Sequence, residues 1–253
     1  MGWHVFAASA TGSSHVETGL PCQDAFAYEV VGKVLCAVVC DGAGSTVSGD
    51  RGAQHVAQRV VQELAERTRQ NMVFIALPTD ELKRELLALI TQVRSELQAQ
   101  AEAAGANLAD YATTLVGVIA TSKGGWMFHI GDGLAVAEPR AGDRSSLVSL
   151  PENGEYANET YFVTCEEWQE HLRLQVIDEP LQTLALMSDG AMPFVMDRGL
   201  TGLFRPFFDP VERFLNTATQ AAGNRALAGV LDDPRTHAIT SDDKTLLIAQ
   251  WRK

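Results

Sequence analysis

Three apolar runs in the middle of the chain follow one another with only a few residues between them. The run TTLVGVIAT (113–121) leads through a KGG turn (123–125) into WMFHIG (126–131), and LAVAEP (134–139) follows soon after. A parallel crossover needs a dozen or more residues, usually a helix, so separators this short require antiparallel pairing. We therefore expect these three strands to form an antiparallel meander.

Helical periodicity is grouped in blocks and does not alternate with single strands. One apolar stripe at helical spacing begins at Ala53, and a second helix is expected from a Thr79/Asp80 cap after Pro78 to a stop at Gly105. Other strand-like runs are WHVFAASA (3–10), FAYEVVG (26–32), VLCAVVC (34–40), TLALM (183–187) and KTLLIAQW (244–251). The region between the last two runs has a helical pattern. These patterns predict an α+β fold with packed antiparallel sheets covered by helices, and a doubly wound parallel sheet is the less favoured alternative.

The length of 253 residues favours one domain, with a polar, irregular surface excursion at about residues 140–180. A net charge of −12 disfavours binding to nucleic acid or anionic lipid. No apolar run approaches the ~18 residues that a membrane span needs, and the N-terminus does not resemble a secretory signal. The four cysteines form no CxxC pair and suit a reducing compartment, so we expect a cytoplasmic protein.

The stretch CDGAGSTVSGD (40–50) ends an apolar run on an acid and turns through glycines toward a helix. Its glycines resemble a phosphate-binding loop, but two known templates fail. Val47 replaces the third glycine of the dinucleotide fingerprint, and Asp50 stands where the P-loop requires lysine. A nucleotide-dependent enzyme is therefore a weak alternative. Ser48 or Asp50 is expected to cap the helix that follows.

Five aspartates lie at or beside the ends of apolar strands, namely Asp24, Asp41, Asp132, Asp189 and Asp242. A carboxylate at the end of a buried strand is costly unless it is paired, hydrogen-bonded or coordinated. A single Asp-Gly usually marks a turn, but packed sheets bring strand ends together, so five such acids indicate a shared site. Oxygen ligands suit Mg²⁺ or Mn²⁺, and a bound cation would attract phosphate that carboxylates alone repel.

The motifs Q-D, D-G-x-G, T-T-L, G-D-G, S-D-G and D-D-x-T follow one another over roughly residues 8–250. In this order they resemble the metal-dependent protein phosphatase 2C (PP2C, or PPM) family of serine/threonine phosphatases, particularly its bacterial branch. Each motif is weak alone, but six in the correct order are specific. The resemblance implies one phosphatase domain over residues 1–253, built as a four-layer αββα sandwich. The excursion at about 140–180 then corresponds to a flap that tunes substrate choice.

The resemblance also implies a set of metal ligands. Asp41 would bridge two ions of Mn²⁺ or Mg²⁺, and the carbonyl of Gly42 would ligate the second ion. Asp189 and Asp242 would complete the protein ligands of the first ion, and Asp132 would match the acid that binds a third, weaker ion. In this arrangement a water between the two ions attacks phosphorus in line, so no nucleophilic side chain is assigned.

Other catalytic roles follow from the same resemblance. Asp24 would orient metal-bound water. Family members usually have an arginine before the Q-D motif that holds the substrate phosphate, and residues 13–24 contain none. His15 is the expected substitute, with Ser13 and Ser14 as helpers.

Several further residues have a structural reading beside a functional one. Thr113 and Thr114 match a motif whose role is mostly structural. Asp243 either caps a turn or exchanges roles with Asp242. His129, in the strand next to the G-D-G motif, is expected to be a core or supporting histidine and not a metal ligand.

These residues predict hydrolysis of phosphoserine or phosphothreonine with two, and in bacterial relatives three, Mn²⁺ or Mg²⁺ ions. The expected partners are a phosphoprotein substrate and a cognate serine/threonine kinase, with the chain itself a monomer. Tyr156 and Asn158 could reach a substrate from the flap. The alternative is a catalytically weak, PP2C-like module that binds phosphoproteins or regulates other proteins, and the missing arginine favours it. Gln23 and Ala43 are further departures from the common pattern.

Overall fold

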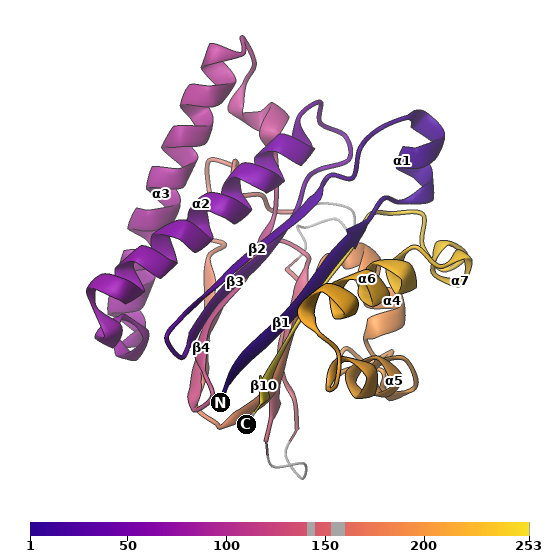
Figure 1. Cartoon of the computed structure of the whole chain (residues 1–253). Helices are drawn as coiled ribbons and strands as arrows, with labels where there is room; N and C mark the ends of the chain where they lie inside the picture. Colours follow the sequence, from indigo (N-terminus) through magenta and orange to yellow (C-terminus); the bar gives the residue numbers. More distant parts are fainter. Residues whose placement is uncertain (141–144, 153–159, 253) are drawn as a thin grey trace.

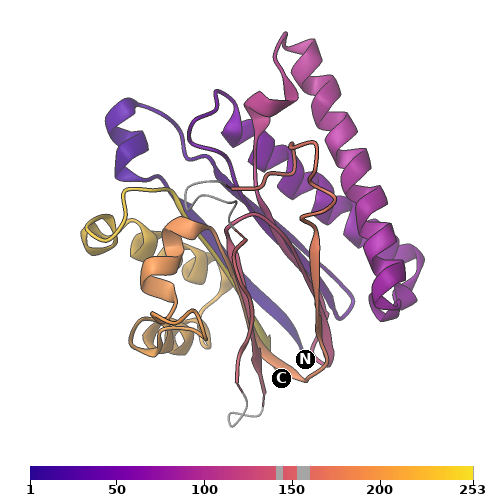
Figure 2. The same cartoon turned by 180° about the vertical axis from the view of Figure 1, so that it is seen from behind.

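The computed structural model describes residues 1–140, 145–152 and 160–252, and Figures 1 and 2 show the chain from opposite sides. The described strands form two five-stranded sheets in which hydrogen-bonded neighbours are antiparallel. The first sheet has the order β1 (Gly2–Ala10), β10 (Lys244–Arg252), β9 (Leu181–Met187), β6 (Leu134–Pro139) and β7 (Leu147–Ser149). The second has the order β2 (Asp24–Val31), β3 (Val34–Asp41), β4 (Leu115–Thr121), β5 (Gly124–Ile130) and β8 (Arg173–Ile177).

Helices cover the outer face of each sheet (Figure 1). The second sheet is covered by α2 (Gly49–Gln70) and α3 (Thr79–Ala103). The first sheet is covered by α4 (Met192–Val195), α5 (Arg205–Leu215), α6 (Gln220–Leu231) and α7 (Pro234–His237). Short helical segments elsewhere are α1 (Ser13–Thr18), η1 (Met72–Ala76), η2 (Leu108–Tyr111) and η3 (Asp189–Ala191). The predicted α+β sandwich with two central antiparallel sheets is therefore confirmed.

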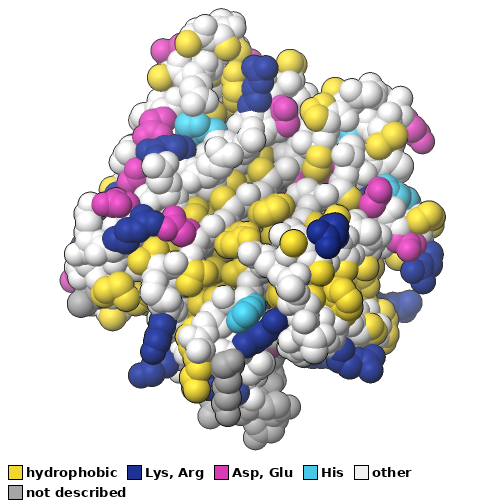
Figure 3. Space-filling model, in the orientation of Figure 1, with side chains coloured by type: hydrophobic (Ala, Val, Ile, Leu, Met, Phe, Trp, Pro, Cys, Tyr) yellow, Lys and Arg dark blue, Asp and Glu magenta, His cyan; other side chains and the backbone are white. Residues whose placement is uncertain are grey.

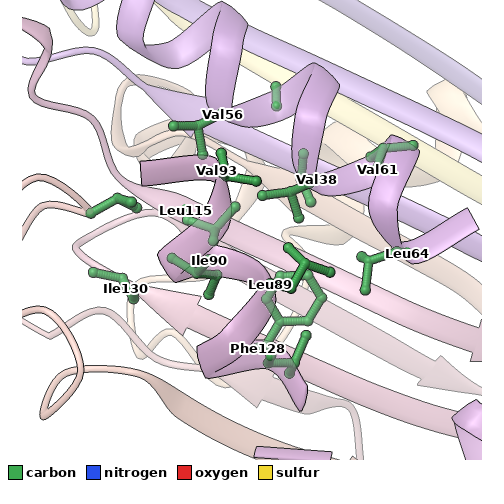
Figure 4. Packing of buried hydrophobic residues seen from close by; sticks show 14 of the residues in the cluster. Val38, Val56, Val61, Leu64, Leu89, Ile90, Val93, Leu115, Phe128 and Ile130 are labelled. Atoms are coloured by element: carbon green, nitrogen blue, oxygen red, sulfur yellow. The ribbon is translucent and has the colours of Figure 1, made fainter. Parts of the chain in front are cut away.

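Strand β3 shows how the sequence produces two core layers. Successive side chains point to opposite faces of a sheet, so alternate residues of VLCAVVC contribute to different clusters. Val38 packs toward α2 and α3, whereas Leu35 and Val39 pack between the two sheets. Figure 4 shows Val38 among side chains of α2 and α3, including Val56 and Ile90. Because both faces of β3 are buried, the run is continuously apolar and does not alternate with polar residues.

The predicted three-stranded meander is wrong at its third strand. β4 pairs with β5 as expected, but β6 pairs with β7 and β9 in the other sheet. The chain changes sheets at Gly131-Asp132-Gly133, where Gly131 has a φ of 105°, a conformation that residues with a side chain rarely adopt. The short separator is therefore a crossing between layers and not a hairpin turn.

The expected helix caps are observed only in part. Ser48 and Pro78 occupy the cap positions of α2 and α3, and neither supplies a side-chain cap hydrogen bond. Asp50 and Asp80 lie in the first turns instead, where a carboxylate interacts favourably with the positive end of the helix dipole.

The excursion at about 140–180 is more ordered than the sequence suggested. It contributes an edge strand to each sheet, β7 and β8, and it buries Val163 and Trp168 against the α3 side of the core. Tyr156 and Asn158, which were expected to reach a substrate, lie outside the described residues. In the described part of the chain, no helix is both long and apolar enough to cross a membrane.

Candidate metal centre

Several strand ends meet at one end of the sandwich, the upper end in Figure 1, between α1 and the beginning of α2. β2 begins and β3 ends there, so Asp24 and Asp41 are paired across the ladder. β9 ends and β10 begins at the same end of the first sheet, which brings Asp189 and Asp242 nearby. The crossing between β5 and β6 adds Asp132. Antiparallel topology thus gathers acids that are far apart in the sequence.

The backbone around Asp41 is fixed by the two threonines of the T-T-L motif. The Asp41 backbone nitrogen donates to Thr114 Oγ1 at 3.0 Å, and the Asp41 carbonyl accepts from Thr113 Oγ1 at 3.0 Å and from the Thr114 nitrogen at 2.9 Å. Both threonines are buried. Their expected structural role is confirmed, since they fix the position from which the Asp41 side chain extends.

The glycine that follows Asp41 has no room for a side chain. A Cβ atom at Gly42 would lie 2.4 Å from the carbonyl carbon of Gly49 and 2.7 Å from the Gln23 carbonyl oxygen. The Gly42 nitrogen donates to that same Gln23 oxygen at 3.1 Å. The start of α2 therefore packs directly on the loop that carries Asp41, as glycine at this position permits.

The five acids act on one another electrostatically. Burial raises the pKa of the Asp41 carboxyl well above its usual range, and the charges of Asp24, Asp189, Asp132 and Asp242 raise it further. Repulsion of this kind weakens with distance, so the shared effect on Asp41 places these carboxyls in one cluster.

Asp189 and Asp24 each have a buried carboxyl oxygen without a hydrogen-bond partner among the described residues, Oδ1 in both cases. Burial raises the pKa of Asp189 to about 6, with Asp132 and Asp242 adding to the rise. Burial raises the pKa of Asp24 to about 7, although Ser188 Oγ donates to Asp24 Oδ2 at 2.7 Å and opposes the shift. Buried oxygens of this kind are costly unless something positively charged approaches them.

Asp243 has the opposite surroundings from its neighbour Asp242. Asp243 Oδ1 accepts from the Gly12 nitrogen at 2.6 Å, and Oδ2 accepts from the Gln23 nitrogen at 2.5 Å and from His15 Nδ1 at 2.9 Å. Its side chain is buried, whereas Asp242 is exposed. Asp243 therefore ties β1, α1 and β2 to the start of β10, and Asp242 is the available acid of the pair.

His15 lies in α1 and is buried beside the glycine loop. Because a carboxylate only accepts, Nδ1 carries the proton that is donated to Asp243. Nε2 lies on the other side of the ring, 3.6 Å from the place that a Cβ at Gly44 would occupy. Ser14 Oγ donates to the Ser241 carbonyl at 2.8 Å, which fastens α1 to the segment before Asp242.

Asp132 is joined to the far end of the excursion. Thr160 Oγ1 donates to Asp132 Oδ2 at 2.5 Å, and burial raises the pKa of Asp132. His129, which lies on the strand before it, is buried and contacts Ser149 Oγ and an Arg173 nitrogen, each at 3.0 Å. Burial lowers the pKa of His129 to about 3, and Arg173 lowers it further, so it is a neutral core histidine as expected.

The donor set fits a hard divalent cation. The clustered side chains offer carboxyl oxygens only, their mutual repulsion raises their pKa values, and two buried oxygens lack partners. In the described part of the chain, no three acidic, histidine or cysteine side chains form a ready-made cage for one ion. Mg²⁺ needs no such cage, because it is commonly held by one or two carboxylates and keeps several waters.

Ser188 and Thr160 were not assigned a role from the sequence, and Asp243 was expected to cap a turn or to exchange roles with Asp242. Ser188 joins Asp24 to β10, since its hydroxyl also accepts from the Thr245 nitrogen at 2.9 Å. Thr160 and Asp243 hold Asp132 and His15 as described above. Ser188 and Asp243 both lie next to a candidate ligand in the sequence, and that adjacency is the signal that could have identified them. No sequence pattern near Thr160 indicates its role, because its partner Asp132 lies 28 residues earlier in the sequence.

Comparison with known proteins identifies the family of this chain. A sequence model of the family described as protein phosphatase 2C matches residues 11–232. Serine/threonine-protein phosphatase 3 of Escherichia coli (strain K12) is 30% identical over 261 residues, covering 99% of each chain.

Solved structures agree on the fold. Serine/threonine phosphatase Stp1 from Staphylococcus aureus superimposes with a TM-score of 0.66 at 16% identity, covering 100% of this chain and 96% of that one. A structure described as a bacterial serine phosphatase gives a TM-score of 0.67 at 16% identity and covers 98% of both chains. The family match spans most of the sequence, and the chain belongs to the protein phosphatase 2C family.

Proposed function

We propose that this chain removes phosphate from phosphoserine or phosphothreonine in a protein substrate, using Mn²⁺ or Mg²⁺ held at the clustered carboxylates. The observation that carries the proposal is that Asp24 and Asp189, beside Asp41, each have a buried oxygen without a hydrogen-bond partner among the described residues. If these acids served only the fold, hydrogen-bond donors would be expected at both oxygens, as they are found at the oxygens of Asp243.

The residues take separate roles in this proposal. Asp41 would be shared between two ions, the Gly42 carbonyl would ligate the second ion, and Asp189 and Asp242 would hold the first. Asp132 would contribute to a third, weaker site. When bound, such ions supply a nucleophilic water at neutral pH and neutralise charge on the phosphoryl oxygens. The chain itself fixes the position of these ligands, mainly through the threonine contacts to Asp41.

Asp24 and His15 act on the reacting groups without holding metal. Asp24, fixed by Ser188, would orient the attacking water through its free Oδ1. His15, whose Nδ1 donates to Asp243, would direct Nε2 toward the phosphate. That arrangement would replace the arginine that residues 13–24 lack. The wider proposal includes a serine/threonine kinase that produces the substrate, and a chain that acts as a monomer in the cytoplasm.

The absence of that arginine also supports a second candidate, a module that binds phosphoproteins with little turnover. The two candidates differ in catalysis and not in metal binding. A chain of the second kind would bind Mn²⁺ and a phosphopeptide and release no phosphate.

Hydrolysis of p-nitrophenyl phosphate tests the proposal. We expect activity with Mn²⁺, loss of activity with EDTA, and recovery when excess Mn²⁺ is restored. The Asp41→Asn variant should lack this activity, while its circular dichroism spectrum matches that of the original protein. Full metal-dependent activity in the variant would refute the metal assignment. Mn²⁺ and phosphopeptide binding without turnover in the original protein would favour the second candidate.

A further inference from the structure

A polar groove lies between the first turns of α2 and the last turns of α3. It encloses a hollow of about 340 Å³. Its lining includes Arg51, Gln54, His55, Gln58, Gln100 and Tyr111. Figure 3 shows charged and histidine side chains among uncharged surface over α2 and α3, whereas hydrophobic side chains dominate the area between α2 and α6. The groove is therefore suited to a polar occupant.

Two chain segments that line the groove lead directly to the loop that carries Asp41. Tyr111 is followed by Ala112, whose carbonyl accepts from the Ala43 nitrogen at 2.9 Å, and then by Thr113, which bridges to Gly42. Consecutive Cα atoms are about 3.8 Å apart, so Tyr111 lies within roughly 8 Å of Thr113. On the other wall, Arg51 is two residues after Gly49, which packs on Gly42. The walls of the groove therefore lie a few residues along the chain from the contacts that fix the Asp41 loop.

Arg51 supplies an uncommitted positive charge. It is exposed and has no hydrogen bond or ion pair to any described residue. Glu96, the acid nearest His55 at 3.9 Å, is bound by Arg59 through two nitrogens at 2.6 and 2.9 Å, so its charge is already compensated. The Arg51 guanidinium is therefore available to pair with an acidic side chain of a bound segment.

The remaining wall offers amide groups. Gln54 and Gln58 are exposed, and Gln100 is held in place by a 3.0 Å contact between its Nε2 and His55 Nδ1. An amide side chain both donates and accepts, which matches the alternating donors and acceptors of an extended peptide backbone. A carboxylate near Arg51 and a backbone along the glutamines together describe an acidic peptide segment.

We propose that this groove docks the acidic segment next to the phosphorylated residue of a protein substrate, with Arg51 binding a Glu or Asp side chain. The proposal rests on the phosphatase function above and specifies which substrates that site prefers. It also locates the selectivity outside the metal ligands, on the exposed surface of α2 and α3.

Charge reversal tests the proposal. The Arg51→Glu variant would be compared with Arg84→Glu, a matched change on α3 whose position is about 24 Å from Gln100 along the helix axis, at 1.5 Å per residue. Substrates would be phosphoserine peptides with Glu, Gln or Lys on both sides of the phosphoserine, with p-nitrophenyl phosphate as the small substrate. For Arg51→Glu we expect the kcat/KM for the Glu peptide to fall by roughly five- to tenfold through KM, as expected for one charge-assisted pair. The Lys peptide should improve, and p-nitrophenyl phosphate should be unaffected.

Peptide binding without turnover separates this proposal from the phosphatase function. Fluorescence anisotropy with labelled peptides would be measured on both variants and on the original protein. A preference for the Glu peptide that Arg51→Glu removes and Arg84→Glu keeps supports docking, whether or not phosphate is released. Equal effects of the two variants, or no preference among the peptides, would overturn the docking proposal. Hydrolysis of p-nitrophenyl phosphate in that case would leave the phosphatase function standing.

Discussion

Asp243 and Asp189 lie at the same end of the sandwich, but their carboxyl groups have opposite surroundings. Asp243 accepts three hydrogen bonds, from Gly12, Gln23 and His15, and both of its oxygens are used. Asp189 has a buried oxygen without a described partner, and its pKa is raised to about 6. The comparison teaches that the donors around a strand-end acid, and not its position in the strand, distinguish an acid that holds the fold from one available to a cation.

Removing the charge of Asp189 should produce the largest effect on activity. We expect Asp189→Asn to lower metal-dependent kcat/KM by about a thousandfold, or ~4 kcal/mol of transition-state stabilisation. The same change removes a buried repulsive carboxyl, so the metal-free variant should unfold at a higher temperature than the original protein. Paired assays of p-nitrophenyl phosphate hydrolysis and thermal unfolding in EDTA measure both. A variant that is less stable without metal and still active would show that Asp189, like Asp243, holds the fold and does not bind the cation.

The corresponding change at Asp243 should act on stability. Asp243→Asn places an amide nitrogen or a neutral oxygen against donors that now face a carboxylate, and we expect the free energy of unfolding to fall by about 3 kcal/mol. Urea denaturation in EDTA and in Mn²⁺ should give similar losses, because the proposed ligands do not include Asp243. A loss seen only in Mn²⁺ would instead identify Asp243 as a metal ligand.

Ser188 joins Asp24 to Thr245 of β10, and its substitution should have a smaller effect on activity. Ser188→Ala removes the hydroxyl that donates to Asp24 and accepts from Thr245, and we expect kcat/KM to fall by about tenfold, the lower range for such supporting contacts. Ser188→Thr retains the hydroxyl and should recover most of the activity. Equal activity of the alanine variant and the original protein would show that Asp24 needs no such support.

The pH dependence of the metal-free protein should be the mildest effect. The folded pKa values of Asp24 and Asp189, about 7 and about 6, exceed the usual 3.8 of the carboxyl group. The folded chain then binds more protons than the unfolded chain between these values, so its stability is greatest below about pH 4 and falls as pH rises through 6 and 7. We expect each of the two groups to contribute a loss of up to about 1.4 kcal/mol per pH unit in EDTA, over the range in which only the folded chain holds its proton. Mn²⁺ should reduce that loss, and a rise in metal-free stability over the same range would contradict the proposed environment.

The sequence predicts the layers and the cluster better than it predicts the partners of each acid. Continuous apolar runs such as VLCAVVC identify strands buried on both faces, and strand-end acids identify the candidate site, because both depend on local patterns. The change of sheet at Gly131 was not predicted, because a separator as short as the one between β5 and β6 fits a hairpin as well as a change of sheet. The role of Asp243 escaped prediction for a related reason. Its donors come from Gly12, Gln23 and His15, more than 200 residues away in the sequence.

Anomalous scattering from a crystal soaked in Mn²⁺ tests the central claim most directly. We expect manganese peaks at the upper end of the sandwich in Figure 1, with carboxyl oxygens of Asp41, Asp189 and Asp242 as ligands and Asp243 still bonded to His15. The absence of manganese at this end, or manganese bound to Asp243 in place of its hydrogen bonds, would contradict the account.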